Sequence, residues 1–379
     1  MKLSKPILFF HCVDNRNINA QSNNTKAILA GWDSKEFPAE ALYFHDPDPA
    51  VAANPNVRLH RMPRNRLWKA YALKLIARKY SAVVYPGLSA VYDDRLRYLR
   101  KFIGNNDTVI TTLEGLPGNA EEEDKENARL SRMAGHRAYC QGINPTNMRA
   151  IDSMKSNADL VVAISPFLER MAAQMWPGRA TAQVPLGVNL DCFNSKGRVP
   201  HGQNLRVRVV AAGSFQLRKR PELFLDLARA HPEADFTWYG DGPRRVTLRQ
   251  QARNAGLGNL DLPGVVNAKA LAQAFRQADI FTLPAVSEGV PKVTQEAAAC
   301  GLPVVCMNYY EPFSVEHGVN GFQAIDDNAY FSHIAALVGD AELRGRMGAA
   351  GTQMAQGWGW KDLARRWQDT ICIAARGRA

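Results

Sequence analysis

The stretch of sequence that decides the fold is residues 280–305, which read IFTLPAVSEGVPKVTQEAAACGLPVV. A short apolar run is followed by a polar loop, by a helical pattern over 293–300 that stops at Gly301, and by a second apolar run over 303–307. Two apolar runs joined through one helix are typical of parallel strands in an α/β fold. Glu288 lies in the loop and Glu296 about one turn inside the helix, so two carboxylates stand at one helix entrance.

The same alternation continues on both sides of this stretch. Before residue 190, the pattern predicts strands at 6–12, 40–44, 57–61, 82–85, 108–112 and 160–164, and helices at 21–31, 66–80, 93–102 and 166–175. After a polar stretch at 194–204, it predicts strands at 207–212, 235–239, 260–262, 280–283 and 303–307, and helices at 221–230, 244–255, 268–278 and 293–300. We therefore expect two doubly wound domains, 1–190 and 191–365, and a C-terminal helix over 366–379 that can cross back to the first domain. Any ligand would lie in the cleft at the carboxyl ends of the strands.

Composition excludes several classes of protein. Of the 379 residues, 46% are hydrophobic and 22% charged, which is ordinary globular usage and excludes disordered, coiled-coil and collagen-like chains. No apolar run approaches the roughly 18 residues of a spanning helix, and the run at 7–10 is too short for a signal peptide, so we expect a cytoplasmic protein. The six cysteines are scattered singly, which indicates free thiols and no zinc cluster.

The positive charge is concentrated in one segment. The net charge is +11, and between Arg58 and Lys101 twelve basic residues face two acidic ones, a net of +10. Two helical patterns there carry bases on one face, which fits either solvated surface helices or a patch that meets an anionic membrane or an acidic acceptor. Nucleic-acid binding is the third interpretation, and it is disfavoured because no nucleic-acid-binding motif accompanies the charge. The sequence leaves open whether this segment meets the inner face of a membrane or is a solvated surface, and we expect no nucleic-acid partner.

The helix entrance at 289–293 has the features of an anion site. Pro291 suits the first helical turn, where its missing N–H costs nothing. The exposed N–H groups near Gly289 and Val290 lie at the positive end of the helix dipole and suit a phosphate or diphosphate. Glycine at 289 lets the backbone approach such a group closely.

Residues 287–305 resemble the Glu-x7-Glu motif of retaining glycosyltransferases with the GT-B fold, in particular the large family 4 type that builds bacterial lipopolysaccharide, capsule and exopolysaccharide sugars. Other segments are similar to this family in the same order: residues 158–165, 184–193, 211–221, 239–243, 315–322 and Trp360. The resemblance covers about residues 158–370, and residues 1–157 only in architecture. It implies two Rossmann-like domains, the first binding the acceptor and the second a nucleotide sugar in the interdomain cleft.

The resemblance also implies roles for single residues. Glu288 would contact the hydroxyls of the donor sugar, and Glu296 the ribose of the nucleotide. Lys219, helped by Arg218, would neutralise the departing diphosphate. Further donor contacts are implied at Gly213, Ser214, Gly240, Gly289, Val290, Pro291 and Val266. The family has an arginine where this chain has Ser214, so Lys219 would act with either Arg218 or Arg220, a choice that the sequence leaves open.

The first domain departs further from the family pattern. Residues 13–24 are polar and glycine-free, so their amides either grip a polar acceptor or cap the following helix. Candidate acceptor contacts are Asp14 and Asn15, Glu114, which stands where the family has a histidine, and His136. A lone histidine in the loop 115–142 is more often solvated than catalytic.

The implied reaction moves a sugar, in our expectation a hexose, from a nucleoside diphosphate sugar to a hydroxyl of a glycan or lipid-linked acceptor, with retention at the anomeric carbon. We expect no cofactor and no metal, because Lys219 and Arg218 would supply the positive charge. The Asp46-Pro47-Asp48 sequence is the one candidate for a metal motif, and its proline indicates a turn. The alternatives are a nucleotide-sugar epimerase on the same fold and a basic nucleic-acid-binding protein.

Overall fold

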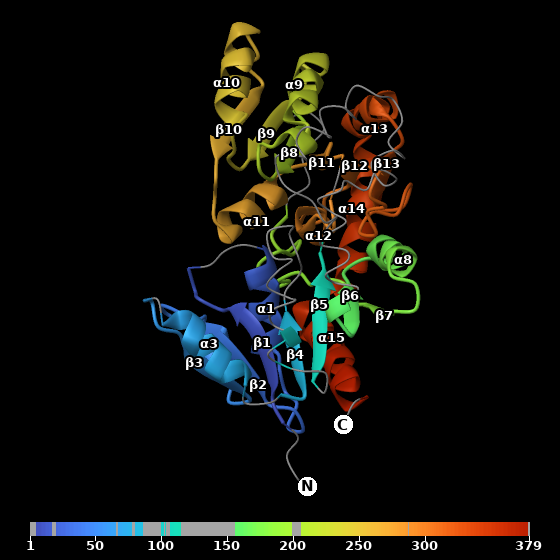
Figure 1. Cartoon of the computed structure of the whole chain (residues 1–379). Helices are drawn as coiled ribbons and strands as arrows, with labels where there is room; N and C mark the ends of the chain where they lie inside the picture. Colours follow the sequence, from blue (N-terminus) through green and yellow to red (C-terminus); the bar gives the residue numbers. More distant parts are fainter. Residues whose placement is uncertain are drawn as a thin grey trace. The chain divides into compact units, whose positions relative to one another are not determined.

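The computed structural model describes residues 5–16, 20–65, 67–77, 80–85, 100–101, 103, 107–114, 156–198, 206–286 and 288–377. These residues form two compact units (Figure 1). The first unit contains the described residues up to 114 together with 156–187 and 360–377, and the second contains 188–359. The two boundaries therefore lie a few residues before those expected at 190/191 and 365/366.

The first unit is built on a seven-stranded parallel sheet. Its strand order is β3-β2-β1-β4-β5-β6-β7, so the order reverses between β1 and β4. The strands are β1 (Ile7–Cys12), β2 (Ala39–Tyr43), β3 (Val57–Arg61), β4 (Ala82–Tyr85), β5 (Thr108–Leu113), β6 (Leu160–Ala163) and β7 (Ala180–Gln183). Described helices of this unit are α1 (Ala20–Ala30), α2 (Pro49–Ala52), α3 (Trp68–Ile76), α8 (Pro166–Met175) and α15 (Trp360–Arg376). Every residue of β4, β5 and β6 is buried, as expected for a parallel sheet covered on both faces.

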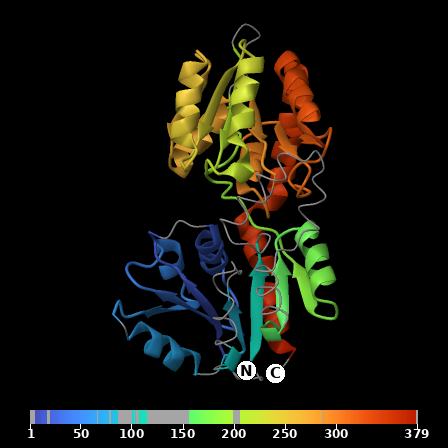
Figure 2. The same ribbon diagram turned by 45° about the horizontal axis from the view of Figure 1, so that its top comes forward.

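Helix α15 belongs to the first unit although it ends the chain. It lies against α1, β4 and β5, and in Figure 1 and Figure 2 its red ribbon runs beside the cyan strand β5. The side-chain oxygen of Gln368 accepts hydrogen bonds from the backbone N–H of Asp33 (2.7 Å) and Ser34 (3.0 Å). The indole of Trp367 donates to the carbonyl of Pro185 at 3.0 Å. Buried polar groups are thus satisfied across this junction, which fixes the helix in register.

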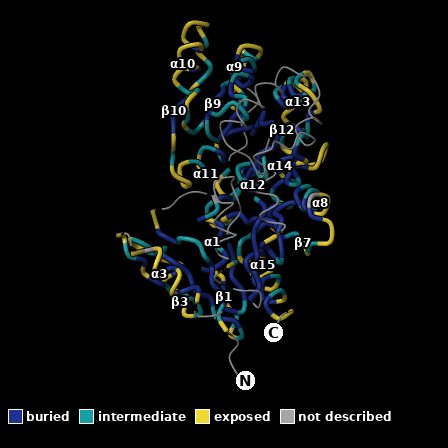
Figure 3. Tube along the Cα trace, viewed as in Figure 1, coloured by how far each residue is buried: buried dark blue, intermediate teal, exposed yellow. Residues whose placement is uncertain are grey.

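The second unit is built on a six-stranded parallel sheet in the order β10-β9-β8-β11-β12-β13. The strands are β8 (Arg208–Ala212), β9 (Asp235–Tyr239), β10 (Leu260–Gly264), β11 (Ile280–Leu283), β12 (Val304–Met307) and β13 (Gly321–Ala324). The helices are η2 (Leu217–Lys219), α9 (Pro221–Ala230), α10 (Arg245–Asn254), α11 (Ala268–Gln277), α12 (Lys292–Ala299), α13 (Asp327–Gly339), α14 (Ala341–Ala355) and η3 (Gln356–Trp358). In its core, Trp238 packs against Phe224 and Phe215, each with 5.2 Å between ring centroids. Figure 3 shows the inner strands as buried and the outer helices α3 and α10 with exposed stretches.

The helix predicted over 66–80 needs correction. Helix α3 covers Trp68–Ile76, with Leu67 at its N-cap and Ala77 at its C-cap, and residues 66, 78 and 79 of the predicted range lie outside the described residues. Its buried face is Ala72, Leu75 and Ile76, whereas Leu67 is 63% exposed. The apolar face predicted from the sequence is therefore only partly buried. Of the helix predicted over 93–102, most lies outside the described residues.

The basic segment is mostly on the surface where the structure describes it. The exposed bases are Arg58, Arg61, Arg64, Lys69, Lys74 and Lys101. Arg100 differs, because its guanidinium binds both oxygens of Asp159 at 3.0 Å and ties the chain to the start of β5 and β6. The five described cysteines are free thiols, as predicted. None of the described helices is long and apolar enough to cross a membrane.

Candidate functional site

The candidate site of the second unit lies where the strand order of its sheet reverses. Strands β8 and β11 are neighbours, but the chain continues from β8 towards one edge and from β11 towards the other. All pairs in this sheet are parallel, so the carboxyl ends of β8, β9 and β11 meet at one edge. Such a reversal point is the usual ligand site of doubly wound sheets. Gly213 follows β8, Gly240 follows β9, and the loop with Glu288 follows β11.

Two glycines let the backbone loops at this edge approach closely. Gly213 has φ of 146° and Gly240 has φ of 139°, in the region that favours glycine. A Cβ atom on Gly240 would lie 2.0 Å from the carbonyl oxygen of Gly213, a distance that no real side chain could accept. The same oxygen accepts a hydrogen bond from the indole of Trp238 at 3.0 Å. On its other side, Gly213 faces the Lys219 ammonium, which would lie 3.8 Å from an added Cβ.

A cluster of three charged side chains stands at the reversal point. The Glu288 carboxylate oxygen Oε1 accepts from Arg218 Nη1 at 2.6 Å and forms an ion pair with the ammonium of Lys219. Lys219 is 8% exposed and Glu288 10%, so the cluster is largely removed from water. Burial alone would raise the pKa of Glu288, but the charges of Lys219 and Arg218 outweigh it and hold the pKa below its usual value. With two cations to one anion, the cluster carries a net positive charge.

The structure answers which arginine joins Lys219. The guanidinium of Arg220 binds the Asp327 carboxylate, with Nη1 donating to Oδ1 at 2.7 Å, and so is engaged elsewhere. Arg218 is the one that reaches Glu288, and its own carbonyl accepts from the backbone N–H of Val286 at 2.8 Å. The side chains of Arg218 and Arg220 point in different directions. Arg218 lies within the short helix η2, whereas Arg220 follows it in the left-handed conformation with φ of 51°.

The entrance of helix α12 differs by one residue from the prediction. Pro291 is the N-cap with ψ of 95°, and the first helical residue is Lys292. Its extended ψ places Pro291 just outside the helix, and the proline side chain has no acceptor for the first N–H groups. The Thr294 hydroxyl instead donates to the Pro291 carbonyl at 2.7 Å. Gly289 and Val290 precede this entrance and are half-buried.

Glu296 lies on the second turn of α12, in surroundings unlike those of Glu288. Burial raises the pKa of its carboxyl, and the charge of Lys292 opposes the rise only in part. It lies within electrostatic range of Cys192 and Cys300, whose thiol pKa values burial raises and the Glu296 charge raises further. Ser214 and Val266 are half-buried and follow β8 and β10.

Sequence reasoning missed Tyr310 and Gln216. The side chain of Tyr310 is buried near Cys306 and Glu288. Burial raises the pKa of Tyr310 well above its usual value, and the charges of Cys306 and Glu288 raise it further. The Gln216 side chain accepts from Arg218 Nε at 3.1 Å and helps to orient the guanidinium. Tyr310 has no signal in the sequence, whereas Gln216 stands two residues before Arg218.

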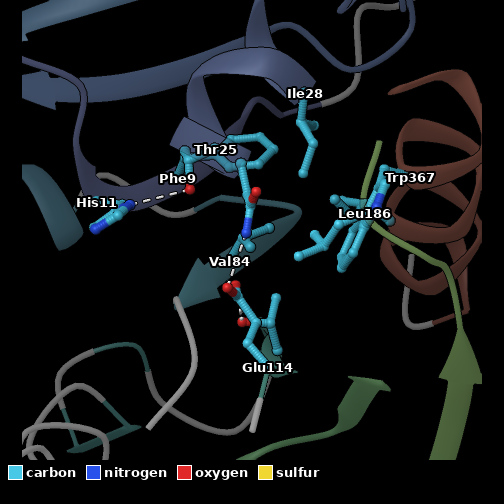
Figure 4. A pocket seen from close by; sticks show the side chains of 11 residues that line it. Phe9, His11, Thr25, Ile28, Val84, Glu114, Leu186 and Trp367 are labelled. Atoms are coloured by element: carbon cyan, nitrogen blue, oxygen red, sulfur yellow. Dashed lines mark hydrogen bonds between the residues drawn. The ribbon is translucent and has the colours of Figure 1, made fainter. Parts of the chain in front are cut away.

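In the first unit, Glu114 lies in a small cavity beneath the reversal point between β1 and β4 (Figure 4). Its carboxylate accepts from Asn24 Nδ2 at 2.9 Å and from the Thr112 hydroxyl at 3.1 Å. His11 Nδ1 lies 3.0 Å from the Thr25 hydroxyl. Burial, with the charge of Lys26 adding to it, lowers the pKa of His11 to about 4, so its ring is neutral near pH 7.

This cavity is too small for a sugar. It measures about 20 Å³, room for one water molecule. Figure 4 shows Trp367 and Leu186 on the side opposite His11, with Glu114 between them. The sequence did not single out His11 or Thr25, and the polar run at 13–24 was the available signal for Asn24.

Asp14 and Asn15 are not among the described residues that line this cavity. The Asp14 carboxylate accepts from the backbone N–H groups of Phe44 (3.1 Å) and His45 (2.6 Å), which holds the turn after β1. Asn15 is exposed, and its backbone N–H donates to the Asp46 carbonyl at 2.8 Å. His136 lies outside the described residues.

The Asp46-Pro47-Asp48 sequence forms a helix start, because the Asp48 carboxylate accepts from the N–H of Ala50 at 3.0 Å. Across the described residues, no three His, Cys, Asp or Glu side chains gather in a way that could hold a metal ion.

Two parallel-sheet Rossmann-like units in one chain are the architecture of the GT-B fold. The chain is similar along nearly its whole length to solved GT-B structures. Sucrose-phosphate synthase from Thermosynechococcus elongatus superimposes with a TM-score of 0.74 at 19% identity, over 97% of this chain and 98% of that one. HepE from Anabaena in complex with UDP-glucose superimposes with a TM-score of 0.72 at 17% identity, over 97% and 100%. The predicted fold class is confirmed.

Similarity in sequence points to glycosyltransferases among proteins with the GT-B fold. Residues 206–340 match the family described as Glycosyl transferases group 1. The GDP-mannose-dependent alpha-(1-6)-phosphatidylinositol monomannoside mannosyltransferase of Mycolicibacterium smegmatis is 26% identical over 59% of this chain and 64% of its own length. The D-inositol 3-phosphate glycosyltransferase of Arthrobacter sp. (strain FB24) is 32% identical over 48% and 47%. The chain thus matches between about half and two thirds of the length of these relatives, and the predicted resemblance to GT-B glycosyltransferases of the family 4 type is confirmed.

Proposed function

We propose that this protein is a retaining glycosyltransferase that moves a hexose from a nucleoside diphosphate sugar to a hydroxyl of a glycan or lipid-linked acceptor in cell-surface polysaccharide synthesis. The observation that carries the proposal is the buried cluster of Glu288, Lys219 and Arg218 at the reversal point of the group 1 domain. Two relatives are named for the transfer of mannose to a phosphatidylinositol mannoside and of a sugar to an inositol phosphate, and these activities support a sugar transfer to a hydroxyl.

Lys219 and Arg218 act on the leaving group in this proposal. The bond between the anomeric carbon and the diphosphate oxygen breaks, the acceptor oxygen bonds to the same face of that carbon, and the departing diphosphate takes the acceptor's proton. Negative charge grows on the diphosphate as the bond breaks, so fixed cations in a site removed from water stabilise the transition state more than the ground state. The same two cations take the role of a metal ion, and turnover is expected to persist in excess chelator.

The remaining residues position the donor. The backbone N–H groups of Gly289 and Val290, before the uncapped entrance of α12, offer donors to the sugar or the diphosphate. Glu288 contacts the hydroxyls of the sugar, and Glu296 accepts from the ribose. Gly213, Ser214, Gly240, Pro291 and Val266 supply the backbone edges around the nucleotide.

The acceptor side is proposed for the first unit. Glu114 is the best-supported contact there, because Asn24 and Thr112 fix its carboxylate at the carboxyl end of β5. Since the cavity beside it holds only one water, the acceptor would meet the mouth of this cavity rather than fill it. Asp14, engaged by two backbone N–H groups, would act by shaping the turn.

A thermal-shift screen against UDP, GDP, ADP and CMP sugars tests the proposal directly. By mass action, a donor at one hundred times its Kd adds about 2.7 kcal/mol to the free energy of unfolding and so raises the melting temperature. We expect one nucleotide class to stabilise the wild type and the Arg346→Met control, and to stabilise Lys219→Met much less. Arg346 is exposed and pairs only with Glu342 on α14 among the described residues. If no nucleotide stabilises the wild type, the proposal fails, and isomerisation of the donor without an acceptor would favour the epimerase instead.

A further inference from the structure

The second unit also contains a pocket at the edge of its sheet opposite to the one with Glu288, Lys219 and Arg218. It measures about 450 Å³, and its lining includes Ser195, Arg198, Asp279, Gly301, Arg344 and Thr352. Asp279 immediately precedes β11 and Gly301 precedes β12, so the pocket is at the amino ends of the strands. Strand β11 is four residues, about 13 Å, long, which separates this pocket from the donor site at its other end. We call it the Arg198–Arg344 pocket.

Two arginine side chains in this pocket have no carboxylate partner among the described residues. Arg198 Nη1 donates to the carbonyls of Phe275 (3.3 Å) and Ala278 (2.8 Å) at the end of α11. Arg344 Nη1 donates to the carbonyls of Leu337 (2.6 Å) and Val338 (3.0 Å) at the end of α13. Each guanidinium is thus anchored through one nitrogen, and within the described part of the chain its Nε and Nη2 atoms have no acceptor. A guanidinium has five N–H donors in a fixed planar arrangement. The Nε and Nη2 donors of Arg198 and Arg344 therefore remain suited to binding an anion.

The charge in the pocket is unbalanced. Burial lowers the pKa of Arg198, the charge of Asp279 acts in the opposite direction, and the nearby charge of Arg344 lowers the pKa by a smaller amount. Asp279 is the one acidic side chain among the described lining residues, and its Oδ2 already accepts from the backbone N–H of Arg208 at 2.8 Å. Two neighbouring half-buried cations against one carboxylate repel each other, and an anion between them would remove that cost.

Helix capping explains the anchoring of each arginine, but not the space between them. A cation that donates to the last carbonyls of a helix is favourable by itself. Small residues line the pocket, and a Cβ on one of them, Gly345, would meet nothing within 4 Å. Helix α14 is also held close, because a Cβ on Gly348 would lie 2.2 Å from the carbonyl oxygen of Gly301. The result is an open space with two guanidinium groups on its wall.

We propose that the Arg198–Arg344 pocket binds a sugar phosphate, with the phosphate between the two guanidinium groups. Arginine pairs bind phosphate through parallel hydrogen bonds, which suits two anchored forks. The carboxylate of Asp279 and the hydroxyls of Ser195 and Thr352 are groups that pair with sugar hydroxyls. A volume of about 450 Å³ falls in the range of small-molecule sites and exceeds what a phosphate ion alone needs.

Calorimetry with glucose 6-phosphate and with inorganic phosphate tests the proposal on the full chain. We expect the wild type to bind glucose 6-phosphate more tightly than inorganic phosphate. Arg344→Met should weaken binding at least about tenfold, a loss typical of one phosphate-binding arginine. Gly345→Leu should weaken it as much while leaving both arginines in place, because the added side chain enters the open space. Leucine favours a helix more than glycine does, so this second variant is expected to fold even where an arginine variant does not.

Two controls separate this pocket from the donor site. Arg346→Met, on the same helix but exposed, and Arg218→Gln, at the donor site, should bind glucose 6-phosphate like the wild type. Loss of binding in Arg218→Gln with normal binding in Gly345→Leu would assign the phosphate to the donor site and overturn the proposal. Absence of binding in the wild type would overturn it as well. Equal affinities for inorganic phosphate and glucose 6-phosphate would contradict the proposal that the pocket also binds the sugar.

Discussion

Lys219 and Arg220 are adjacent in the chain, and the structure gives them different partners. Lys219 pairs with the buried Glu288, whereas Arg220 turns away and pairs with Asp327 on α13. The Glu288 pair lies at the reversal point of the sheet, and the Asp327 pair joins η2 to a helix. Substitution of these neighbouring cations can therefore separate the proposed catalytic role of Lys219 from a structural role of Arg220.

We expect Lys219→Met to reduce kcat by about 10²–10³-fold, the usual effect of removing one group that stabilises transition-state charge. Arg218 remains beside Glu288 in this variant and keeps that carboxylate paired, so the fall in melting temperature should be smaller than that of Glu288→Gln. Arg220→Met should show the reverse, a fall in melting temperature of about 2–4 °C with kcat near the wild-type value. Steady-state kinetics and thermal denaturation of both variants measure the two effects. Near-normal turnover in Lys219→Met would remove it from the proposed mechanism.

The two carboxylates of the motif should have opposite effects on the pH dependence of stability. The pKa of Glu288 is below its ordinary value of 4.5 and that of Glu296 above it. An acid with a lowered folded-state pKa stabilises the protein above its unfolded pKa and loses that effect as the pH falls through the folded pKa. An acid with a raised pKa destabilises the protein as the pH rises past the unfolded pKa.

We therefore expect Glu288→Gln to lower the free energy of unfolding at neutral pH and to approach the wild type in acid. Glu296→Gln should raise it at neutral pH and also converge with the wild type in acid. Urea unfolding at several pH values measures both differences. Glu342 is exposed, and Glu342→Gln serves as the control. This variant should leave the free energy of unfolding nearly unchanged at both neutral and acid pH. Parallel pH profiles for the two site variants would contradict the opposite surroundings of the two carboxylates.

At the scale of elements, close helix approach explains why α15 needs a glycine on its neighbour. A Cβ on Gly31, at the end of α1, would lie 2.8 Å from the Ala364 Cβ on α15. Gly31→Ala should therefore destabilise the protein by about 1–3 kcal/mol, the range for overpacking. Ala364→Gly in that background should restore part of the loss, which a double-mutant cycle measures. Gly345→Ala, where the new Cβ meets nothing, should be stabilising by about 0.5–1 kcal/mol. Additive effects at 31 and 364 would argue against this contact.

The elements that the sequence predicts well are those with strong local patterns. Strands β3, β4, β9 and β11 and helices α8 and α9 have the predicted bounds, because apolar runs and caps such as Ser165 before Pro166 mark them. Helix α14 was not predicted, since its glycines at 345, 348 and 351 give it a low helix propensity. Tertiary packing overrides that propensity, because Gly348 and Gly351 allow α14 to lie against Gly301 and Ala298. The edge strands β7 and β13 are as short as β4 and β11 but read ATAQ and GFQA, so no apolar run marks them in the sequence.

The candidate site was predictable to the level of residue type and position in the chain. The motif of Glu288 and Glu296 and the basic residues at 218–220 lie at one edge of one sheet, which follows from parallel topology. The choice of Arg218 over Arg220 depends on a left-handed residue after a three-residue helix, which no periodicity reveals. Tyr310 and the Arg198–Arg344 pocket depend on contacts between residues far apart in sequence, so only the fold brings them together.

At the scale of the whole molecule, the asymmetric charge leads to a prediction about membranes. The exposed bases of β3, α3 and the loop between them lie near exposed apolar side chains, Leu67, Tyr71 and Leu73. Each base near an anionic surface contributes about 1 kcal/mol of attraction, and apolar side chains can enter the interface. This combination supports a membrane contact more than charge alone, which would fit a solvated face equally well.

We expect the protein to sediment with vesicles rich in anionic lipid at low salt and to dissociate as salt screens the charge within about 10 Å. Replacing Arg61, Arg64 and Lys74 with glutamate should abolish sedimentation. Replacing Arg249, Arg253 and Arg346, exposed bases of the second unit, changes the net charge equally and should have little effect, because those bases lie on other helices. Equal losses in the two triple variants would show that net charge alone drives binding. If the protein sediments equally with anionic and neutral vesicles, the basic segment is a solvated surface and not a membrane contact.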